Sequence, residues 1–192
     1  MSKETDIFEI RFHARAGQGA KSAAQFVAEA ALEEGKYIQA FPFYGPEREG
    51  APMQAFVRIS EKPIRLHSEV ISPEAVIIID AGLIKVEDVT SGLCKDCFII
   101  INTKETPEKI KEELDFDGQV YTVDASTIAK KHLKKDIPNT VLVGALLKAR
   151  PELVDIEKVK TQVRKKFMKK YGPEMTEANI KAIDDGYNQV QS

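Results

Sequence analysis

A strand, a glycine turn and a helix follow one another directly near the start of this chain, and this succession restricts the fold more than any other feature. Ile7 to Ala14 (IFEIRFHA) is rich in β-forming residues, and the glycines follow in the segment RAGQG, residues 15–19. Small apolar side chains then recur with helical spacing and suit close packing on a sheet; they are Ala20, Ala23, Ala24, Val27, Ala28 and Ala31. A second strand pattern from Tyr37 to Phe41 completes a βαβ unit, whose two strands normally run parallel. We therefore expect an α/β fold.

The middle of the chain predicts further strands in the same sheet. Ala75 to Asp80 (AVIIID) and Cys97 to Asn102 (CFIIIN) are near-continuous apolar runs, typical of central strands that are covered on both faces. A short helix from Lys85 to about Ser91 would join these two strands, and Gln119 to Val123 is a further strand.

The sheet should be mixed, because Gln54 to Ser60 and Ile64 to His67 flank a proline turn and predict a hairpin. A helix capped by Asp124 or Ser126 should end near Lys135. Further helices are expected over Asn139 to Lys148, over Ile156 to Lys170 with Gly172 closing it, and over Glu174 to Val190. The predicted fold is a three-layer α/β/α sandwich in one domain, residues 1–192, with a mixed, mostly parallel sheet and a helical C-terminal third.

Composition argues against several classes of protein. The chain has 192 residues, of which 43% are hydrophobic and 30% charged, and its net charge is −2. Such a balance gives no general attraction to nucleic acid or to an anionic membrane. No apolar run approaches the roughly 20 residues of a membrane-spanning helix. Because the N-terminal sequence MSKETDIFEIRF is charged and lacks the apolar core of a secretory signal, we expect a cytoplasmic protein.

The two cysteines, Cys94 and Cys97, form a CxxC pattern that is a weak metal signal by itself. Zinc and iron–sulfur clusters normally use four ligands, whereas the three histidines are scattered at His13, His67 and His132. We interpret the cysteines as structural and expect no metal site.

The glycine turn allows a ligand-binding and a purely structural interpretation. Glycines at a strand–helix junction let a ligand approach the free amides of the helix, which favour anions. The dinucleotide fingerprint is not met, because Ser22 occupies its third glycine position and no acidic residue ends the second strand. The alternative is that Gly17 and Gly19 only make a tight turn. Asp80 ends a predicted central strand, where α/β sheets bind ligands, although a capping or turn role is favoured for it.

A second unusual segment joins the strand patterns around Phe41 and Gln54. Its prolines and glycines fix an irregular path rather than a loose one; they are Pro42, Gly45, Pro46, Gly50 and Pro52. Inside this path Arg48 lies between Glu47 and Glu49.

These segments together resemble the gamma subunit of the 2-oxoacid:ferredoxin oxidoreductases, and the pyruvate enzyme is the closest likeness. The resemblance covers most of the chain and rests on the GQG turn, YIQAFPFYGPEREGAP, VRIS, AVIIID, the IIINT strand end and IPNTVLVGAL. The pairing of GQG with the later GPERxGAP is its most specific part. Many members carry glycine where this chain has Ala14 and Ala16, and a second arginine where it has Glu49.

The resemblance implies an enzyme that oxidatively decarboxylates a 2-oxoacid, joins the acyl group to coenzyme A and reduces ferredoxin. Pyruvate is the expected substrate, with the branched-chain 2-oxoisovalerate as runner-up. A free-standing coenzyme A- or nucleotide-binding module is the alternative from another class. In the family, thiamine diphosphate and the iron–sulfur clusters are held mainly by partner subunits. The implied partners are alpha, beta and delta subunits and, through the complex, ferredoxin. This chain alone is expected to bind no cofactor and to be inactive.

Carried onto this sequence, the family motifs give the candidate site. Gly17, Gln18, Gly19 and Arg48 are candidate cofactor-binding residues, and no catalytic or metal-binding residue is expected. Arg48 could meet an anion, such as a coenzyme A phosphate or the 2-oxoacid carboxylate, or a carboxylate of a neighbouring subunit. Subunit docking is favoured, because the flanking glutamates partly neutralise the arginine; Phe41, Phe43 and Tyr44 would then be apolar anchors. The interface or active-site loop comprises Phe43, Tyr44, Gly45, Pro46, Glu47, Gly50 and Pro52, with Ala51 also in the motif.

Overall fold

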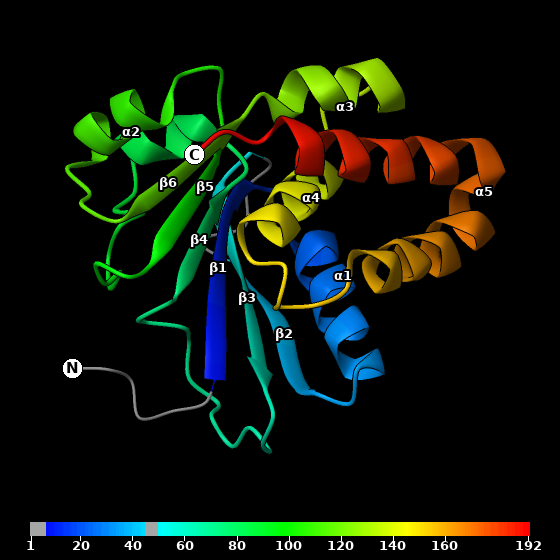
Figure 1. Cartoon of the computed structure of the whole chain (residues 1–192), viewed down its shortest axis with the longest axis horizontal. Helices are drawn as coiled ribbons and strands as arrows, with labels where there is room; N and C mark the ends of the chain where they lie inside the picture. Colours follow the sequence, from blue (N-terminus) through cyan, green and yellow to red (C-terminus); the bar gives the residue numbers. More distant parts are fainter. Residues whose placement is uncertain (1–6, 45–49) are drawn as a thin grey trace.

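The computed structural model describes residues 7–44 and 50–192, without the side chain of Tyr44. In this part of the chain six strands form one sheet, in the order β2-β3-β1-β4-β5-β6 (Figure 1). The strands are β1 (Ile7–Arg15), β2 (Tyr37–Tyr44), β3 (Pro52–Ser60), β4 (Ala75–Ile78), β5 (Phe98–Asn102) and β6 (Gln119–Val123). The helices are α1 (Ala20–Glu33), α2 (Pro107–Leu114), α3 (Ala125–Leu133), α4 (Asn139–Ala149) and α5 (Ile156–Gln189), with a short 3-10 helix η1 (Ala81–Lys85).

The sheet is mixed and mostly parallel, as predicted. β1, β4, β5 and β6 pair in parallel, whereas β3 is antiparallel to both β1 and β2. β1 and β2 therefore run in the same direction with β3 between them, which confirms the parallel βαβ unit. The predicted hairpin is wrong, because β3 already pairs on both edges. Residues 64–67 form no strand and instead pass the sheet beside β2, where Gln39 Nε2 donates to the Leu66 carbonyl at 2.8 Å.

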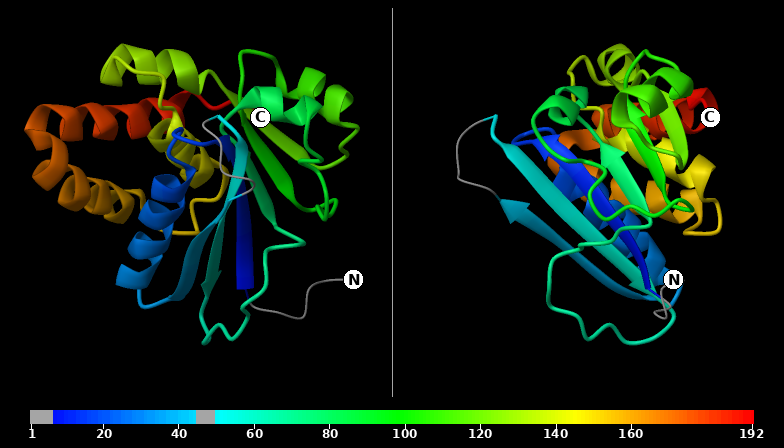
Figure 2. Two further views of the ribbon diagram at one scale, coloured as in Figure 1. Left: turned by 180° about the vertical axis from the view of Figure 1, so that it is seen from behind. Right: turned by 90° about the vertical axis from the view of Figure 1, so that its left-hand side faces the viewer.

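Helices cover both faces of the sheet, which gives the expected three layers. α1 and α4 pack on one face with α5 outside them, where it contacts α1, α3 and α4, while α2 and η1 lie on the other face (Figures 1 and 2). The alanine stripe of α1 is fully buried in the larger core cluster, so its small side chains bring the helix backbone close to the sheet. The apolar runs of β4 and β5 are buried on both faces, as a central position requires.

Two short helices differ from the prediction. The expected helix from Lys85 to Ser91 is wrong: η1 begins directly after β4, because the Asp80 side chain accepts from the Gly82 amide and caps it. α2 was not predicted, although its start carries a clear signal. Thr106 caps it by accepting from the Lys109 amide, and proline occupies its first turn.

The C-terminal third is helical as predicted, and the break at Gly172 is confirmed. Within α5 this residue has φ 78° and ψ 179°, and Pro173 follows it. The second half of α5 crosses α4 at two glycines. A Cβ added at Gly144 would lie 2.0 Å from the Ile183 carbonyl, and one added at Gly186 would lie 2.1 Å from the Val141 carbonyl. The helix backbones are therefore in direct contact.

The face of β1 opposite α1 carries buried polar side chains that hold the connection after η1. Arg11 Nη2 donates to the carbonyls of Val89 and Ser91 at 3.1 and 2.7 Å. Arg11 Nε donates to His13 Nε2 at 3.0 Å, so His13 carries its proton on Nδ1 and directs it to Glu87 at 2.8 Å. Burial lowers the pKa of His13, although Glu87 opposes the shift.

Candidate functional site

The glycine turn between β1 and α1 is shaped by the side chain of Gln18. Gly17 and Gly19 have φ of 94° and 85°, a region that favours glycine. Between them Gln18 accepts from the Arg15 amide through Oε1 at 2.7 Å and donates through Nε2 to Asp80 Oδ2 at 2.8 Å. Both ends of the Gln18 amide group are thus used within the chain, so its observed role is to hold the turn.

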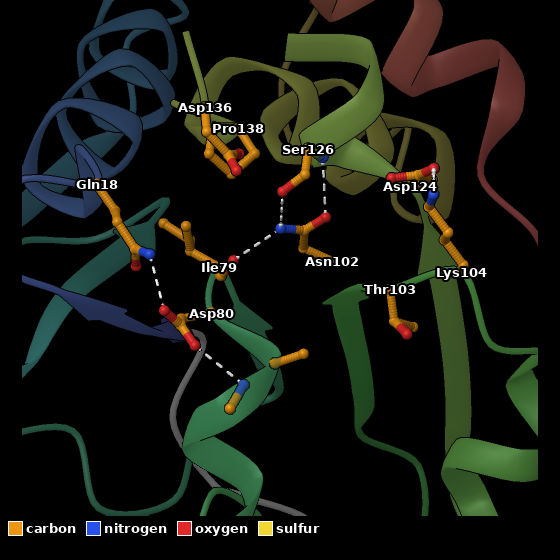
Figure 3. Close-up of a pocket in the computed structure, with 12 residues that line it drawn as sticks. Gln18, Ile79, Asp80, Asn102, Thr103, Lys104, Asp124, Ser126, Asp136 and Pro138 are labelled. Carbon is orange, nitrogen blue, oxygen red and sulfur yellow. Dashed lines mark hydrogen bonds and ion pairs between the residues drawn. The ribbon is translucent and has the colours of Figure 1, made fainter. Parts of the chain in front are cut away.

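Asp80 joins this turn to the carboxyl end of β4. Its Oδ1 accepts from the Gly82 amide at 2.9 Å, and its Oδ2 lies 3.3 Å from Arg15 Nε. The favoured capping role of Asp80 is therefore present, and the same carboxylate also orients the two side chains of the turn, as Figure 3 shows for Gln18.

The second motif meets the first at the start of β3. Arg15 Nη1 donates to the Gly50 carbonyl at 3.1 Å, and the Ala16 amide donates to the Ala51 carbonyl at the same distance. The structure thus brings Gly50, Ala51 and Pro52 beside Arg15 and Ala16, which directly precede Gly17, Gln18 and Gly19. Of the other predicted residues, Gly45, Pro46, Glu47 and Arg48 lie outside the described residues, as does the side chain of Tyr44.

Asn139, the first residue of α4, is a part of the site that the sequence reasoning did not single out. Its side-chain amide donates to the Gly19 carbonyl at 3.1 Å, and it is buried. The contact is so close that a Cβ on Gly19 would lie 2.5 Å from Asn139 Nδ2. In the sequence Asn139 was marked only by its place in the IPNTVLVGAL segment. Its contact with Gly19 could not be predicted from local pattern, because the two residues are 120 positions apart.

A polar cleft of about 360 Å³ opens at the carboxyl ends of the parallel strands β4, β5 and β6 (Figure 3). Open α/β sheets commonly bind ligands at this edge. Asn102 spans the cleft floor: its Nδ2 donates to the Ile79 carbonyl and to Ser126 Oγ, and its Oδ1 accepts from the Ser126 amide, all at 3.0 Å. This side chain therefore joins β4, β5 and α3.

Two carboxylates of the cleft, Asp124 and Asp136, have a lowered pKa. A hydrogen bond from Lys130, together with one from Ser126, lowers the pKa of Asp136. Burial opposes ionisation of Asp124, but hydrogen bonds from Thr127 outweigh it and leave the Asp124 pKa lowered. Neither group is poised to donate a proton near neutral pH.

A second hollow, of about 270 Å³, lies where the turn meets α5. Gly17, Gly19 and Ser22 line one part of it, and the apolar side chains of Phe167, Tyr171 and Met175 line another. The glycine turn therefore borders two spaces of different character, one polar and one largely apolar.

The aromatic residues of β2 lie on the sheet face that carries Arg58. Phe41 packs against Phe56 with ring centroids 5.3 Å apart, and Phe43 lies 6.4 Å from Phe56. Phe43 keeps 43% of its surface exposed, whereas Phe56 is buried. An exposed aromatic ring beside a glycine- and proline-rich loop suits a protein contact.

The cysteines lie away from this region. Cys94 and Cys97 form a disulfide in the connection before β5, in keeping with a structural interpretation. Across residues 7–44 and 50–192, no group of His, Cys, Asp and Glu side chains is arranged to hold a metal ion.

The chain matches the family model described as pyruvate ferredoxin/flavodoxin oxidoreductase over residues 9–189. It is 45% identical over 184 residues to pyruvate synthase subunit PorC of Thermotoga maritima, covering 96% of this chain and 95% of that one. It is also 45% identical over 186 residues to the pyruvate/ketoisovalerate oxidoreductases common subunit gamma of Pyrococcus abyssi, covering 96% and 98% of the two chains.

Solved structures give the same result for the fold. The crystal structure of pyruvate oxidoreductase subunit PORC from Thermotoga maritima matches with a TM-score of 0.86 and 41% identity, covering 97% of this chain and 98% of that chain. The 2-oxoglutarate:ferredoxin oxidoreductase of Magnetococcus marinus matches with a TM-score of 0.79 at 21% identity, covering 96% of this chain but 31% of that one. This second match is a likeness of fold alone.

Proposed function

Because this chain belongs to the pyruvate ferredoxin/flavodoxin oxidoreductase family, we propose that it works as the gamma subunit of a pyruvate synthase. The observation that carries the proposal is the similarity to PorC of Thermotoga maritima, which spans nearly all of both chains in sequence and in fold. The resemblance predicted from the sequence motifs is thereby confirmed. The assembled enzyme would convert pyruvate and coenzyme A to acetyl-CoA and carbon dioxide, with the electrons passed to ferredoxin.

The chain is proposed to act only within a complex. Its sister chains would be alpha, beta and delta subunits, which would hold thiamine diphosphate and the iron–sulfur clusters and deliver electrons to ferredoxin. The described site supports this division of roles, because its polar side chains are paired with one another and with the backbone. Such an arrangement shapes a surface and supplies no activated nucleophile.

Two contacts of this chain with the rest of the enzyme are proposed. The turn of Gly17, Gln18 and Gly19 would border the space for coenzyme A, with Gln18 holding its shape. Arg48 would pair with a carboxylate of a sister subunit, and Phe41 and Phe43 would pack beside it. Support for the second contact comes from the exposed ring of Phe43 and from the hydrogen bonds that hold Gly50 and Ala51.

Co-expression with the sister subunits tests the function. Pyruvate- and coenzyme A-dependent reduction of ferredoxin should require this chain and should be absent from the subcomplex that lacks it. Turnover of pyruvate by the purified chain alone, or full activity of the subcomplex without it, would contradict the proposal.

The variant Arg48→Ala separates the two roles considered for this residue. Docking predicts weaker association with the sister subunits at an unchanged Michaelis constant for coenzyme A. Normal association with a raised Michaelis constant would assign Arg48 to ligand binding instead. Arg65→Ala is a control that removes an exposed arginine from another loop.

A second candidate function is a gamma subunit shared by two enzymes. The Pyrococcus abyssi relative is named as common to pyruvate and ketoisovalerate oxidoreductases, at the same 45% identity. A test adds this chain to the catalytic subunits of each enzyme and measures ferredoxin reduction with pyruvate and with 2-oxoisovalerate. A shared subunit should restore both activities, whereas a dedicated subunit should restore only the activity with pyruvate.

The cytoplasm is the proposed location, and fractionation of the source cells tests it. No helix in the described ranges has the length and apolar character needed to cross a membrane.

A further inference from the structure

Arg15 occupies the point where the two motifs of the site meet. It is the last residue of β1, and its register partner is Pro52, the first residue of β3. Its guanidinium group lies between the Asp80 carboxylate, 3.3 Å from Nε, and the Gly50 carbonyl, 3.1 Å from Nη1. One planar side chain thus bridges the end of β4 and the residue that leads into β3.

The Asp80 carboxylate fixes the direction in which this side chain points. It already accepts from the Gly82 amide and from Gln18, so η1 and the glycine turn hold it on two sides. A carboxylate held in this way gives the Arg15 guanidinium a fixed ion-pair partner. The guanidinium then reaches the Gly50 carbonyl without further adjustment.

The strand ladder gives Gly50 and Ala51 little backbone support in the described residues. Arg15 and Pro52 face each other without exchanging hydrogen bonds, because the odd-numbered residues of β1 direct their backbone groups to β4, as the His13 carbonyl does to the Ile79 amide. Before Pro52 the described contacts are two hydrogen bonds. The Ala16 amide donates to the Ala51 carbonyl, and the Arg15 side chain donates to the Gly50 carbonyl. Gly50 itself has φ 77°, so its backbone is set in one of the conformations that glycine permits.

We propose that Arg15 is a positioning residue that holds Gly50 and Ala51 against the glycine turn, so that Gly50, Ala51 and the turn meet a sister subunit as one unit. This inference rests on the proposed docking role. It assigns Arg15 no contact with substrate or cofactor. Its geometry makes a specific demand: Nε faces the Asp80 carboxylate while Nη1 reaches the Gly50 carbonyl, and a lysine, whose donors all lie on one nitrogen, cannot reproduce this planar fork.

Reconstitution provides the test. Arg15→Lys, Arg15→Gln and Arg48→Ala are each titrated into the subcomplex of sister subunits, and ferredoxin reduction is measured against the concentration of added chain. Arg164→Gln is the matched control, because Arg164 is also ion-paired, lies 3.6 Å from Glu177 and is 41% exposed, against 36% for Arg15.

We expect the concentration at half-maximal activity to rise about tenfold for both Arg15 variants, equivalent to ~1.4 kcal/mol of association free energy. The activity at saturation should stay at the wild-type level, and Arg164→Gln should behave as wild type. Hydrogen exchange on each full-length chain without its sister subunits should show faster exchange of the Ala16 amide in both Arg15 variants than in the wild type. The proposal would be overturned if Arg15→Lys reached half-maximal activity at the same concentration as the wild-type chain. A positive charge alone would then be enough to hold Gly50 and Ala51.

A loss of activity at saturation would also overturn it, because it would place Arg15 in catalysis rather than in positioning. Failure of the wild-type chain to restore activity, or a normal titration of Arg48→Ala, would instead count against the proposed function. In either case exchange of the Ala16 amide still decides whether Arg15 holds the segment.

Discussion

Replacing Gly19 by alanine should destabilise the chain more than the same change at Gly17, although both glycines have positive φ. The two sites have similar backbone conformations, with φ of 85° and 94°. Their surroundings differ. A Cβ at Gly17 meets nothing within 4 Å, whereas one at Gly19 lies 2.5 Å from Asn139 Nδ2 and 2.9 Å from Asn139 Cγ.

These distances give the expected magnitudes. Placing alanine in the left-handed region costs about 1–2 kcal/mol, and this should be the whole effect of Gly17→Ala. At Gly19 the Asn139 side chain must also move away and give up its 3.1 Å hydrogen bond to the Gly19 carbonyl. Because Asn139 is buried, this loss adds about 1–3 kcal/mol. Gly19→Ala should therefore cost about 2–5 kcal/mol.

Urea unfolding of the purified chain, followed by circular dichroism, measures both costs. Asn139→Ala removes the two atoms that a Cβ on Gly19 would approach most closely. In that background Gly19→Ala should cost no more than the backbone term, so the double-mutant cycle should show a coupling of about 1–3 kcal/mol. Equal costs for Gly17→Ala and Gly19→Ala, or additivity in the cycle, would refute the reasoning.

Three further predictions concern the scaffold around the site. Burial lowers the pKa of His13 below the ordinary 6.5, so the unfolded chain binds this proton more readily; the free energy of unfolding should fall as the pH drops below 6.5, and urea titrations of His13→Gln should show a flatter profile there. Gly186→Ala should lower the free energy of unfolding by about 1–3 kcal/mol or more in the same urea assay, because its Cβ would lie 2.1 Å from the Val141 carbonyl and force α4 and α5 apart. Asn102→Asp should cost about 1–3 kcal/mol in thermal unfolding, because a carboxylate cannot donate to the Ile79 carbonyl.

Local patterns predicted most of the elements because their evidence lies within a few residues. The small side chains of α1 and the apolar runs of β4 and β5 are each buried as their spacing required. The break at Gly172 was also readable, since glycine followed by proline ends a helix. The start of α2 carried an equally clear signal in Thr106 and Pro107, which the sequence reasoning overlooked.

The pairing of strands was harder to predict because it depends on distant segments. Residues 64–67 have a strand-like composition, but β3 already has β1 and β2 as neighbours. The segment nearest to β3 in the sequence is therefore not its partner. The backbone of β3 forms its hydrogen bonds with β1 and β2 instead. The contact between Asn139 and Gly19 was equally hard to predict, since 120 positions separate the two residues.

The site itself could be predicted as two motifs but not as one arrangement. In the sequence the turn and the later loop are separate segments, and their spacing gives no reason for them to occur together. The register supplies the reason: Arg15 pairs with Pro52, so the end of β1 and the start of β3 lie at the same edge of the sheet. The turn that follows β1 and the loop that precedes β3 are adjacent for this reason.

This adjacency also changes what Gln18 and Asp80 can contribute. A glutamine in a glycine turn suggests a donor for a ligand, yet here its oxygen accepts from the Arg15 amide and its nitrogen donates to Asp80. A ligand that took either end would have to break a contact that holds the turn. The same applies to Asp80, whose two oxygens serve Gly82, Gln18 and Arg15. The turn therefore offers a partner its shape and its remaining backbone amides, and a protein surface or an anion is the kind of partner that such a corner can meet.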